Sequence, residues 1–306
     1  MPNWNSLLDE VNKSGSTFDI TRRKYIKALN KLTGRNVIVY YSGWLQKSAQ
    51  IPNYRGFTVN DNDKNGFMTA IHGLDRSKGL DLILHTPGGE GAATESLVDY
   101  LRSMFGVNIR AIIPQLAMSA GTMIALSCKE VLMGKHSSLG PIDPQFGGLP
   151  AHGIIEEFNR AAADISKNPA LIHLWQPIIA KYNPTLIGEC EKAMKWSEEM
   201  VTEWLISGMF LGEDDAKEKA EKIVNELGNH ILMKSHARHI SAEKAESLGI
   251  KLVALENDQK IQEAVMSVHH SCIITLTSTS AYKIIENHEG TAFIERMDQV
   301  FSPVPF

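Results

Sequence analysis

The amino-acid sequence predicts an α/β fold built on parallel strands. Two largely apolar runs, Leu82–Leu84 and Ile109–Ile113, suit strands that are covered on both faces of a sheet. A helix predicted over residues 92–105 separates them, and this strand, helix, strand order requires a right-handed crossover between parallel neighbours. The chain has 306 residues and a hydrophobic content of 43%, so it can bury a full core.

The first elements precede this unit. Residues 19–32 are predicted to form a helix, because Tyr25, Leu29 and Leu32 fall on one helical face, and Gly34 ends it. Residues 36–42 follow as the first strand. We therefore expect residues 1–35 to be an N-terminal helical segment, and residues 48–60 to be a loop long enough for an exposed flap.

Residues 61–66 resemble the start of a calcium-binding loop, with oxygen-bearing side chains at the first, third and fifth positions and glycine at the sixth. The twelfth position should be a bidentate glutamate and is His72. The same residues can cap a helix over residues 67–74, and we favour that interpretation. No metal site is predicted.

The central unit contains two short glycine motifs. The predicted strand 80–85 ends in His-Thr-Pro-Gly-Gly at residues 85–89, where Pro87 stops the strand ladder. Strand 108–113 is followed by Met-Ser-Ala-Gly at residues 118–121, which opens a helix over residues 120–128, and residues 130–133 form the next strand. Both motifs therefore follow the carboxyl ends of parallel strands, where α/β proteins bind ligands.

Ser119 has two interpretations. A serine before a helix commonly caps the first turn. Alternatively, its hydroxyl is a nucleophile, because the amide of Ala120 points to where an oxyanion would form and the Pro-Gly-Gly turn frees the amide of Gly89 as a second donor. The second interpretation predicts an acyl-transfer site.

These motifs, together with Ser-Leu-Gly-Pro-Ile-Asp-Pro at residues 138–144, resemble the serine dehydrogenase proteinase family of the ClpP/crotonase superfamily, which is related to SppA signal peptide peptidases. The resemblance runs from about residue 80 to residue 255. It implies a ClpP/crotonase-like ββα spiral core and a serine peptidase with Ser119 as nucleophile. It implies neither a cofactor nor a metal.

The second half of the chain is predicted to be mainly helical. Helices are expected over residues 154–165, 170–181, 186–206 and 214–227, and a closing helix and strand over residues 240–249 and 251–255. We expect residues 36–255 to be the catalytic domain, with a helical insertion at about 150–228. Residues 256–306 are expected to be a helical tail with one long helix over residues 258–286.

The general base is not fixed by the sequence. ClpP uses Ser-His-Asp and SppA uses Ser-Lys, and this chain departs from both patterns. His236 and Asp143 stand where ClpP has its aspartate and histidine, so they could work as a pair with exchanged positions. Lys192 lies where SppA supplies its lysine, with Lys195 and Lys167 as weaker candidates.

Three other histidines are interpreted as structural. His85 lies on a buried strand, and the adjacent His269 and His270 cannot face one metal from the same side of a helix.

Composition narrows the class of protein. The net charge of −4 makes a nucleic-acid partner unexpected. Three cysteines without CxxC spacing disfavour a disulfide framework or a zinc site and fit a reducing compartment. Neither a signal peptide nor a membrane span is visible, so we expect a soluble cytoplasmic protein.

The main hypothesis is an ATP-independent serine endopeptidase acting on a peptide or protein substrate through an acyl-enzyme on Ser119. One alternative is a crotonase-type acyl-CoA enzyme, in which the same two amides polarise a thioester and Ser119 is idle. Another is a non-catalytic assembly protein. The resemblance also implies a homo-oligomer, in which residues 258–286 could pack between subunits.

Overall fold

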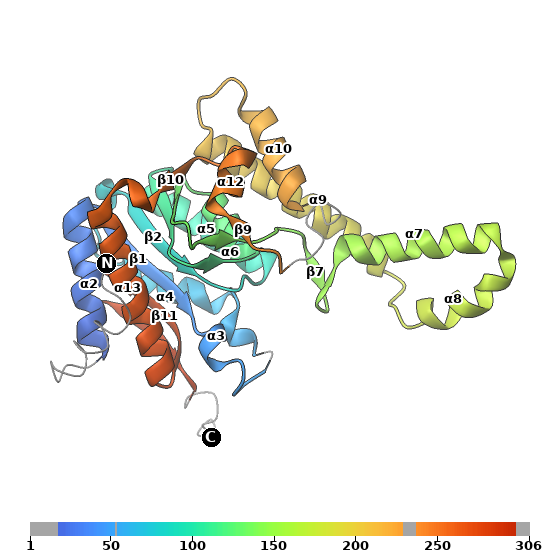
Figure 1. Ribbon diagram of the computed structural model, residues 1–306, viewed down its shortest axis with the longest axis horizontal. Helices are drawn as coiled ribbons and strands as arrows, with labels where there is room; N and C mark the ends of the chain where they lie inside the picture. The colour runs from blue at the N-terminus through green and yellow to red at the C-terminus, as the bar shows by residue number, and fades with distance from the viewer. Residues whose placement is uncertain (1–17, 53, 229–236, 298–306) are drawn as a thin grey trace.

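A seven-stranded mixed sheet forms the centre of the molecule in the computed structural model, which describes residues 18–52, 54–228 and 237–297 (Figure 1). The strand order is β10-β5-β3-β2-β1-β11-β12, and the five strands from β10 to β1 run parallel. β11 is antiparallel to β1, and β12 is antiparallel to β11. The predicted α/β class is therefore confirmed. The strands are β1 (Asn36–Ser42), β2 (Leu80–His85), β3 (Ile109–Ile113), β5 (Glu130–Met133), β10 (Leu252–Ala254), β11 (Ala281–Asn287) and β12 (Ala292–Arg296).

Two helical layers cover the sheet. On one face lie α2 (Phe18–Thr33) and α13 (Gln259–Ser278), which pack against each other and the sheet (Figure 1). The other face is covered by α4 (Asn62–Ile71), α5 (Gly91–Phe105), α6 (Ala120–Leu126), α9 (Leu186–Trp204), α10 (Ala216–Gly228) and α12 (Ala242–Leu248).

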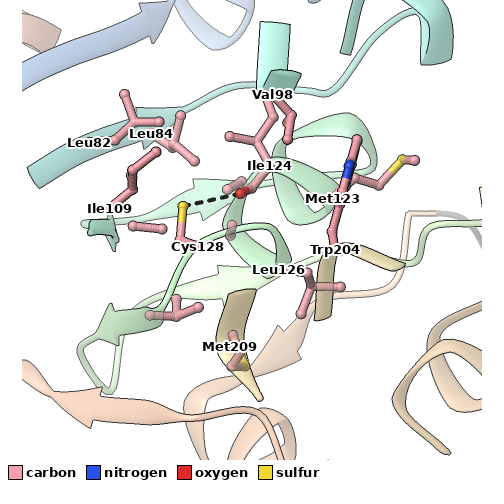
Figure 2. Close-up of a cluster of buried hydrophobic side chains, with 14 of the residues drawn as sticks. Leu82, Leu84, Val98, Ile109, Met123, Ile124, Leu126, Cys128, Trp204 and Met209 are labelled. Atoms are coloured by element: carbon pink, nitrogen blue, oxygen red, sulfur yellow. Dashed lines mark hydrogen bonds between the residues drawn. The ribbon is translucent and has the colours of Figure 1, made fainter. Parts of the chain in front are cut away.

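Residues of the central strands alternate between the two cores. In β2, Leu82 and Leu84 belong to the larger core while Ile83 belongs to the core under α2 and α13. This alternation explains the continuous apolar runs, because each strand has no solvent-facing side. Figure 2 shows that α6 lies inside the larger core, where the Cys128 thiol donates to the carbonyl of Ile124 at 3.3 Å. Cys128, Cys190 and Cys272 are all free and buried.

Two small sheets and several short helices complete the body. β4 (Leu116–Ala117), β6 (Ser138–Leu139) and β9 (Ile240–Ser241) form one sheet, and β7 (Gln145–Phe146) pairs with β8 (Leu149–Pro150). The short helices are α3 (Trp44–Lys47), η1 (Arg55–Phe57), η2 (Arg76–Lys78), η4 (Leu205–Met209, a π-helical segment) and η5 (Leu255–Asn257).

An arm of helices projects from the body. It consists of α7 (Ala151–Lys167), η3 (Pro169–Leu171) and α8 (Ile172–Ile179), and Figure 1 shows α8 at the end far from the sheet. Ile172, Leu174 and Ile178 on α8 are exposed. No helix in the described ranges has the length and apolarity that crossing a bilayer would require.

The structure corrects two expectations. The tail is not wholly helical: α13 ends at Ser278, and residues 281–296 form β11 and β12 of the main sheet. All the residues of β11 are buried, and the strand pairs with β1 at the edge where the parallel strands stop. The helix expected at 67–74 begins at Asn62, and Asp61 makes no side-chain capping bond.

Candidate active site

Ser119 lies on a strained turn between β4 and α6. The amide of Gly121 donates to the carbonyl of Met118 at 2.8 Å, and Ser119 between them has φ 50° and ψ −116°, the geometry of the first central residue of a type II′ turn. Glycine is preferred there, and Ser119 is the only non-glycine residue of the described chain with positive φ. Its side chain makes no capping bond. Ser119 occupies the cap position without performing the capping function.

The Pro-Gly-Gly turn lies against this serine. A Cβ atom placed on Gly88, which has φ +100°, would lie 2.5 Å from Ser119 Cβ and 3.0 Å from the Ala120 amide nitrogen. Gly121 approaches the other side of the same turn, because its Cβ would lie 2.5 Å from Thr86 Cγ2. Each of these glycines is therefore required by close packing between the two motifs.

Main-chain hydrogen bonds join the two motifs directly. The Thr86 amide donates to the carbonyl of Leu116 at 3.1 Å, and the Met118 amide donates to the carbonyl of Thr86 at 3.0 Å. These two bonds form an isolated parallel bridge between Thr86 and Ala117, which holds together the segments that precede the two turns. The serine turn (residues 118–121) and the glycine turn (residues 87–89) are therefore fixed relative to each other.

Gly89 is held from its other side by Val59. The Val59 amide donates to the Gly88 carbonyl at 2.8 Å, and the Glu90 amide donates to the Val59 carbonyl at 2.9 Å. In a parallel bridge of this kind, the intervening residue directs its own amide away from the partner strand. The Gly89 amide therefore points away from Val59, and Gly89 itself is exposed.

A cavity of 660 Å³ opens over the two turns. The glycine turn, the loop after β6, the segment around Thr58 and one face of α9 surround it. The residues that line it are Arg55, Thr58, Pro87, Gly88, Gly89, Glu90, Gly91, Ser119, Met123, Ile142, Asp143, Pro144, Gln145, Phe146, Gly148, Ala193, Trp196, Ser197 and Met200.

Asp143 is buried and lines this cavity together with Ser119. Its loop is anchored to the serine helix, because the amide of Gly140 donates to the Thr122 hydroxyl at 2.9 Å. The Ile142 amide also donates to the carbonyl of Leu227 at 3.1 Å. His236, the predicted partner of Asp143, lies outside the described residues.

The structure does not bring the candidate lysines to the cavity. Lys192 is 76% exposed and pairs with Glu189 at 3.0 Å, and Lys195 is 75% exposed and pairs with Glu199 at 3.6 Å. Lys167 ends α7 and is also exposed. A lysine base needs burial, which favours the neutral amine. The helix α9 presents Ala193, Trp196 and Ser197 to the cavity instead.

His85 and His269 belong to a buried aromatic cluster. The His85 ring lies 4.5 Å from Trp44 and 5.5 Å from His269 between centroids, and the Tyr41 hydroxyl lies 3.2 Å from His269 Nδ1. Burial lowers the pKa of His85 to about 3, and burial followed by the neighbouring His85 lowers the pKa of His269 well below its usual range. Neither histidine lines the cavity.

Sequence reasoning missed the segment that contains Arg55, Thr58 and Val59, which was expected to be an exposed flap. Val59 is fully buried, and Arg55 and Thr58 line the cavity. The apolar Phe57 and Val59 at alternate positions were a signal for a short extended segment, but they stood inside a loop with proline and glycine.

Comparisons with known proteins show the family of the chain. A family model described as ClpP-like SDH-type serine proteinase matches residues 12–270. Two uncharacterized proteins of Methanocaldococcus jannaschii, MJ1495 and MJ0137, are each 31% identical to the chain, over 202 and 218 residues. The matches cover 66% and 71% of this chain and 61% and 66% of those relatives, which is less than two thirds of their length. The chain belongs to the ClpP-like SDH-type serine proteinase family.

Proposed function

We propose that the protein is an ATP-independent serine endopeptidase with Ser119 as its nucleophile. One observation carries the proposal: Ser119 is held at φ 50° against the Gly88–Gly89 turn and faces a 660 Å³ cavity. A strained serine whose hydroxyl is not used for capping is typical of nucleophiles on strand-to-helix turns. The family of the chain supports the same chemistry.

In this mechanism, Ser119 Oγ attacks the scissile carbonyl carbon and its proton passes to a general base. The carbonyl oxygen becomes an oxyanion that accepts hydrogen bonds from the amides of Gly89 and Ala120. Collapse of the tetrahedral intermediate breaks the C–N bond, and the base returns the proton to the leaving amine. Water then hydrolyses the Ser119 ester by the same steps, releasing the acid and restoring the hydroxyl.

We assign the base to His236, with Asp143 orienting it. Asp143 supports this choice, because it is buried at the cavity wall on a loop tied to the serine helix. Lys192 does not fit the same role, because its exposed side chain is paired with Glu189. Among the described residues that line the cavity there is neither a lysine nor a histidine.

The acyl-CoA alternative uses the same amides without a nucleophile. It gives no reason for a serine in a conformation that glycine prefers, since any small residue could occupy an idle position. The peptidase hypothesis explains that feature, and we retain it.

The test is Ser119→Ala, assayed with a library of unstructured peptides and with a fluorophosphonate probe. We expect the variant to fold like the wild type, to lose hydrolysis and to take up no probe, while intact mass and peptide mapping place the wild-type adduct on Ser119. Hydrolysis that persists in the variant, or an adduct on another residue, would reject the assignment. Binding of CoA esters by calorimetry would favour the alternative.

We also propose that the peptidase acts as a homo-oligomer on peptide or protein substrates. The exposed apolar residues of α8 support this, because Ile172, Leu174 and Ile178 project on an arm (Figure 1). The predicted contact through residues 258–286 is not favoured, since most of α13 is buried by α2 and the sheet of its own chain. Light scattering that finds a monomer at concentrations where hydrolysis occurs would contradict the proposal.

A further inference from the structure

The segment that holds the glycine turn is itself anchored by a fully buried ion pair. Lys283, on β11, places Nζ 2.6 Å from Asp63 Oδ1, and both side chains have no exposed surface. The pair lies on the α4 side of the sheet. Burying two charges is costly unless every charged atom finds hydrogen-bonding partners, so the other contacts of this pair show what it holds in place.

Two of those contacts reach the residues that flank Val59, and Lys283 Nζ also lies 3.9 Å from Glu295 Oε2 on β12. Lys283 Nζ donates to the carbonyl of Thr58 at 2.9 Å. Asp63 Oδ2 accepts from the Asn60 amide at 3.0 Å and from the Tyr40 hydroxyl at 2.7 Å. The cation therefore fixes the peptide before Val59, and the carboxylate fixes the peptide after it.

Val59 transmits this constraint to the glycine turn. Its amide and carbonyl bond Gly88 and Glu90, so the peptide planes around Gly89 are set by Val59. The approach is close, because a Cβ on Gly89 would overlap the main chain of Val59. A shift of Val59 by a few tenths of an ångström must rotate the Gly89 amide or break the bridge.

We infer that Lys283 and Asp63 are positioning residues that aim the Gly89 amide at the oxyanion of the reaction. The inference rests on the proposed function, because it gives the Gly89 amide a catalytic task. β11 follows the region matched by the family model, which ends at residue 270, so the family match assigns no role to Lys283.

The test uses Lys283→Met and the charge-neutral pair Lys283→Met/Asp63→Asn. The single variant leaves Asp63 buried without its cation and could fail to fold, whereas the double variant removes both charges and retains an amide oxygen for Asn60. We expect kcat for peptide hydrolysis and the rate of fluorophosphonate labelling to fall about 10- to 100-fold, with KM changed less than about twofold, because a misaimed amide loses transition-state stabilisation rather than substrate binding.

Arg22→Met is the matched control. Arg22 is equally buried and pairs with Glu286 on the same strand β11, but it lies on the α2 side of the sheet. It should lower the melting temperature without changing kcat per folded molecule. A fall in kcat of the same size in Arg22→Met would overturn the inference, since the effect would then be general destabilisation.

Hydrogen exchange separates this inference from the proposed function. In the Lys283 variants, the amides of Val59 and Glu90 should exchange at least about tenfold faster while those of β2 and α13 keep the wild-type rate; in Arg22→Met, Val59 and Glu90 should not change. Unchanged exchange at Val59 and Glu90 in the Lys283 variants would overturn the inference even in an active enzyme. If the wild type neither hydrolyses peptides nor labels Ser119, the proposed function fails, and exchange still decides whether the pair positions the turn.

Discussion

At the scale of single residues, the backbone conformation of Ser119 is unfavourable, and no capping hydrogen bond from its side chain offsets this cost. With φ 50° and no capping bond, the residue is held by the contacts of its neighbours. Left-handed conformations cost a non-glycine residue about 1 to 2 kcal/mol. A serine kept at this position for its function lowers the stability of the fold, and the loss can be measured as a free energy of unfolding.

We predict that Ser119→Gly is more stable than the wild type by about 1 kcal/mol, because glycine adopts this conformation without strain. Ser119→Ala should have nearly the wild-type free energy of unfolding, since it keeps the strain and loses no capping bond. Urea denaturation of the three proteins measures both differences. A loss of about 1 kcal/mol in Ser119→Ala would instead show that the hydroxyl caps α6.

A second residue-scale prediction concerns the base. If His236 accepts the serine proton and Asp143 orients it, His236→Gln and Asp143→Asn should each lower kcat about 10³-fold or more, as in other serine hydrolases. Lys192→Met should leave kcat unchanged, because the exposed ammonium pairs with Glu189 on its own helix. Steady-state kinetics with one peptide substrate compares all three. The opposite pattern, with only Lys192→Met inactive, would replace the histidine by a lysine base.

At the scale of elements, the serine turn and the glycine turn pack so closely that side chains are excluded between them. We predict that Gly88→Ala lowers the free energy of unfolding by about 3 kcal/mol, because its Cβ would overlap Ser119 Cβ and the Met118 carbonyl. The rate of peptide hydrolysis should fall at least about 100-fold. Gly73→Ala is the control. Gly73 also has positive φ, at +82°, but nothing lies within 4 Å of its Cβ position, so only the strain of about 1 kcal/mol should remain. Equal losses in both variants would refute the packing argument.

The elements that could be predicted from the sequence are those that local patterns define. β1 and β2 have the predicted bounds, α2 is longer than predicted by one residue at each end, and α5 begins one residue earlier than predicted. The two glycine motifs could likewise be recognised from their order along the chain.

What the sequence could not reveal depends on contacts between distant residues. The start of α4 at Asn62 has a local cause, because the Asn60 side chain accepts from the Asn62 amide and Asp63 accepts from the Asn60 amide. The partner of the buried Asp63 carboxylate, Lys283, lies 220 residues later and could not be predicted. β11 was expected to be helical because its fully buried sequence has no period of two, which antiparallel strands covered on one face normally show. The role of Val59 depends on its bridge to Gly89, and no local sequence pattern predicts a contact between these two segments.

At the scale of the whole molecule, the two faces of the sheet have different tasks. The face under α4, α5, α6 and α9 holds the cavity, whereas the face under α2 and α13 is a closed core that contains the aromatic and histidine cluster. His85 is the last residue of β2 and immediately precedes the Thr-Pro-Gly-Gly turn, so β2 runs from the closed core to the site.

The last prediction is that the molecule loses stability in mild acid through this cluster. Burial lowers the pKa of His85 to about 3 and that of His269 well below its usual range, so both are neutral in the folded state. Their unfolded pKa is about 6.5. The unfolded chain therefore binds more protons below pH 6.5, and stability that is fully present above this pH falls as the pH decreases toward 3.

At pH 5 the buried His85 imidazole should cost about 2 kcal/mol relative to pH 7. Urea denaturation at the two pH values measures the difference, which should shrink by about 2 kcal/mol in His85→Phe because phenylalanine binds no proton. His173→Gln, at an exposed position on α8, should keep the wild-type difference. Comparing differences rather than absolute stabilities removes the packing change that phenylalanine introduces. A His85→Phe protein as acid-sensitive as the wild type would mean that His85 is protonated in the fold.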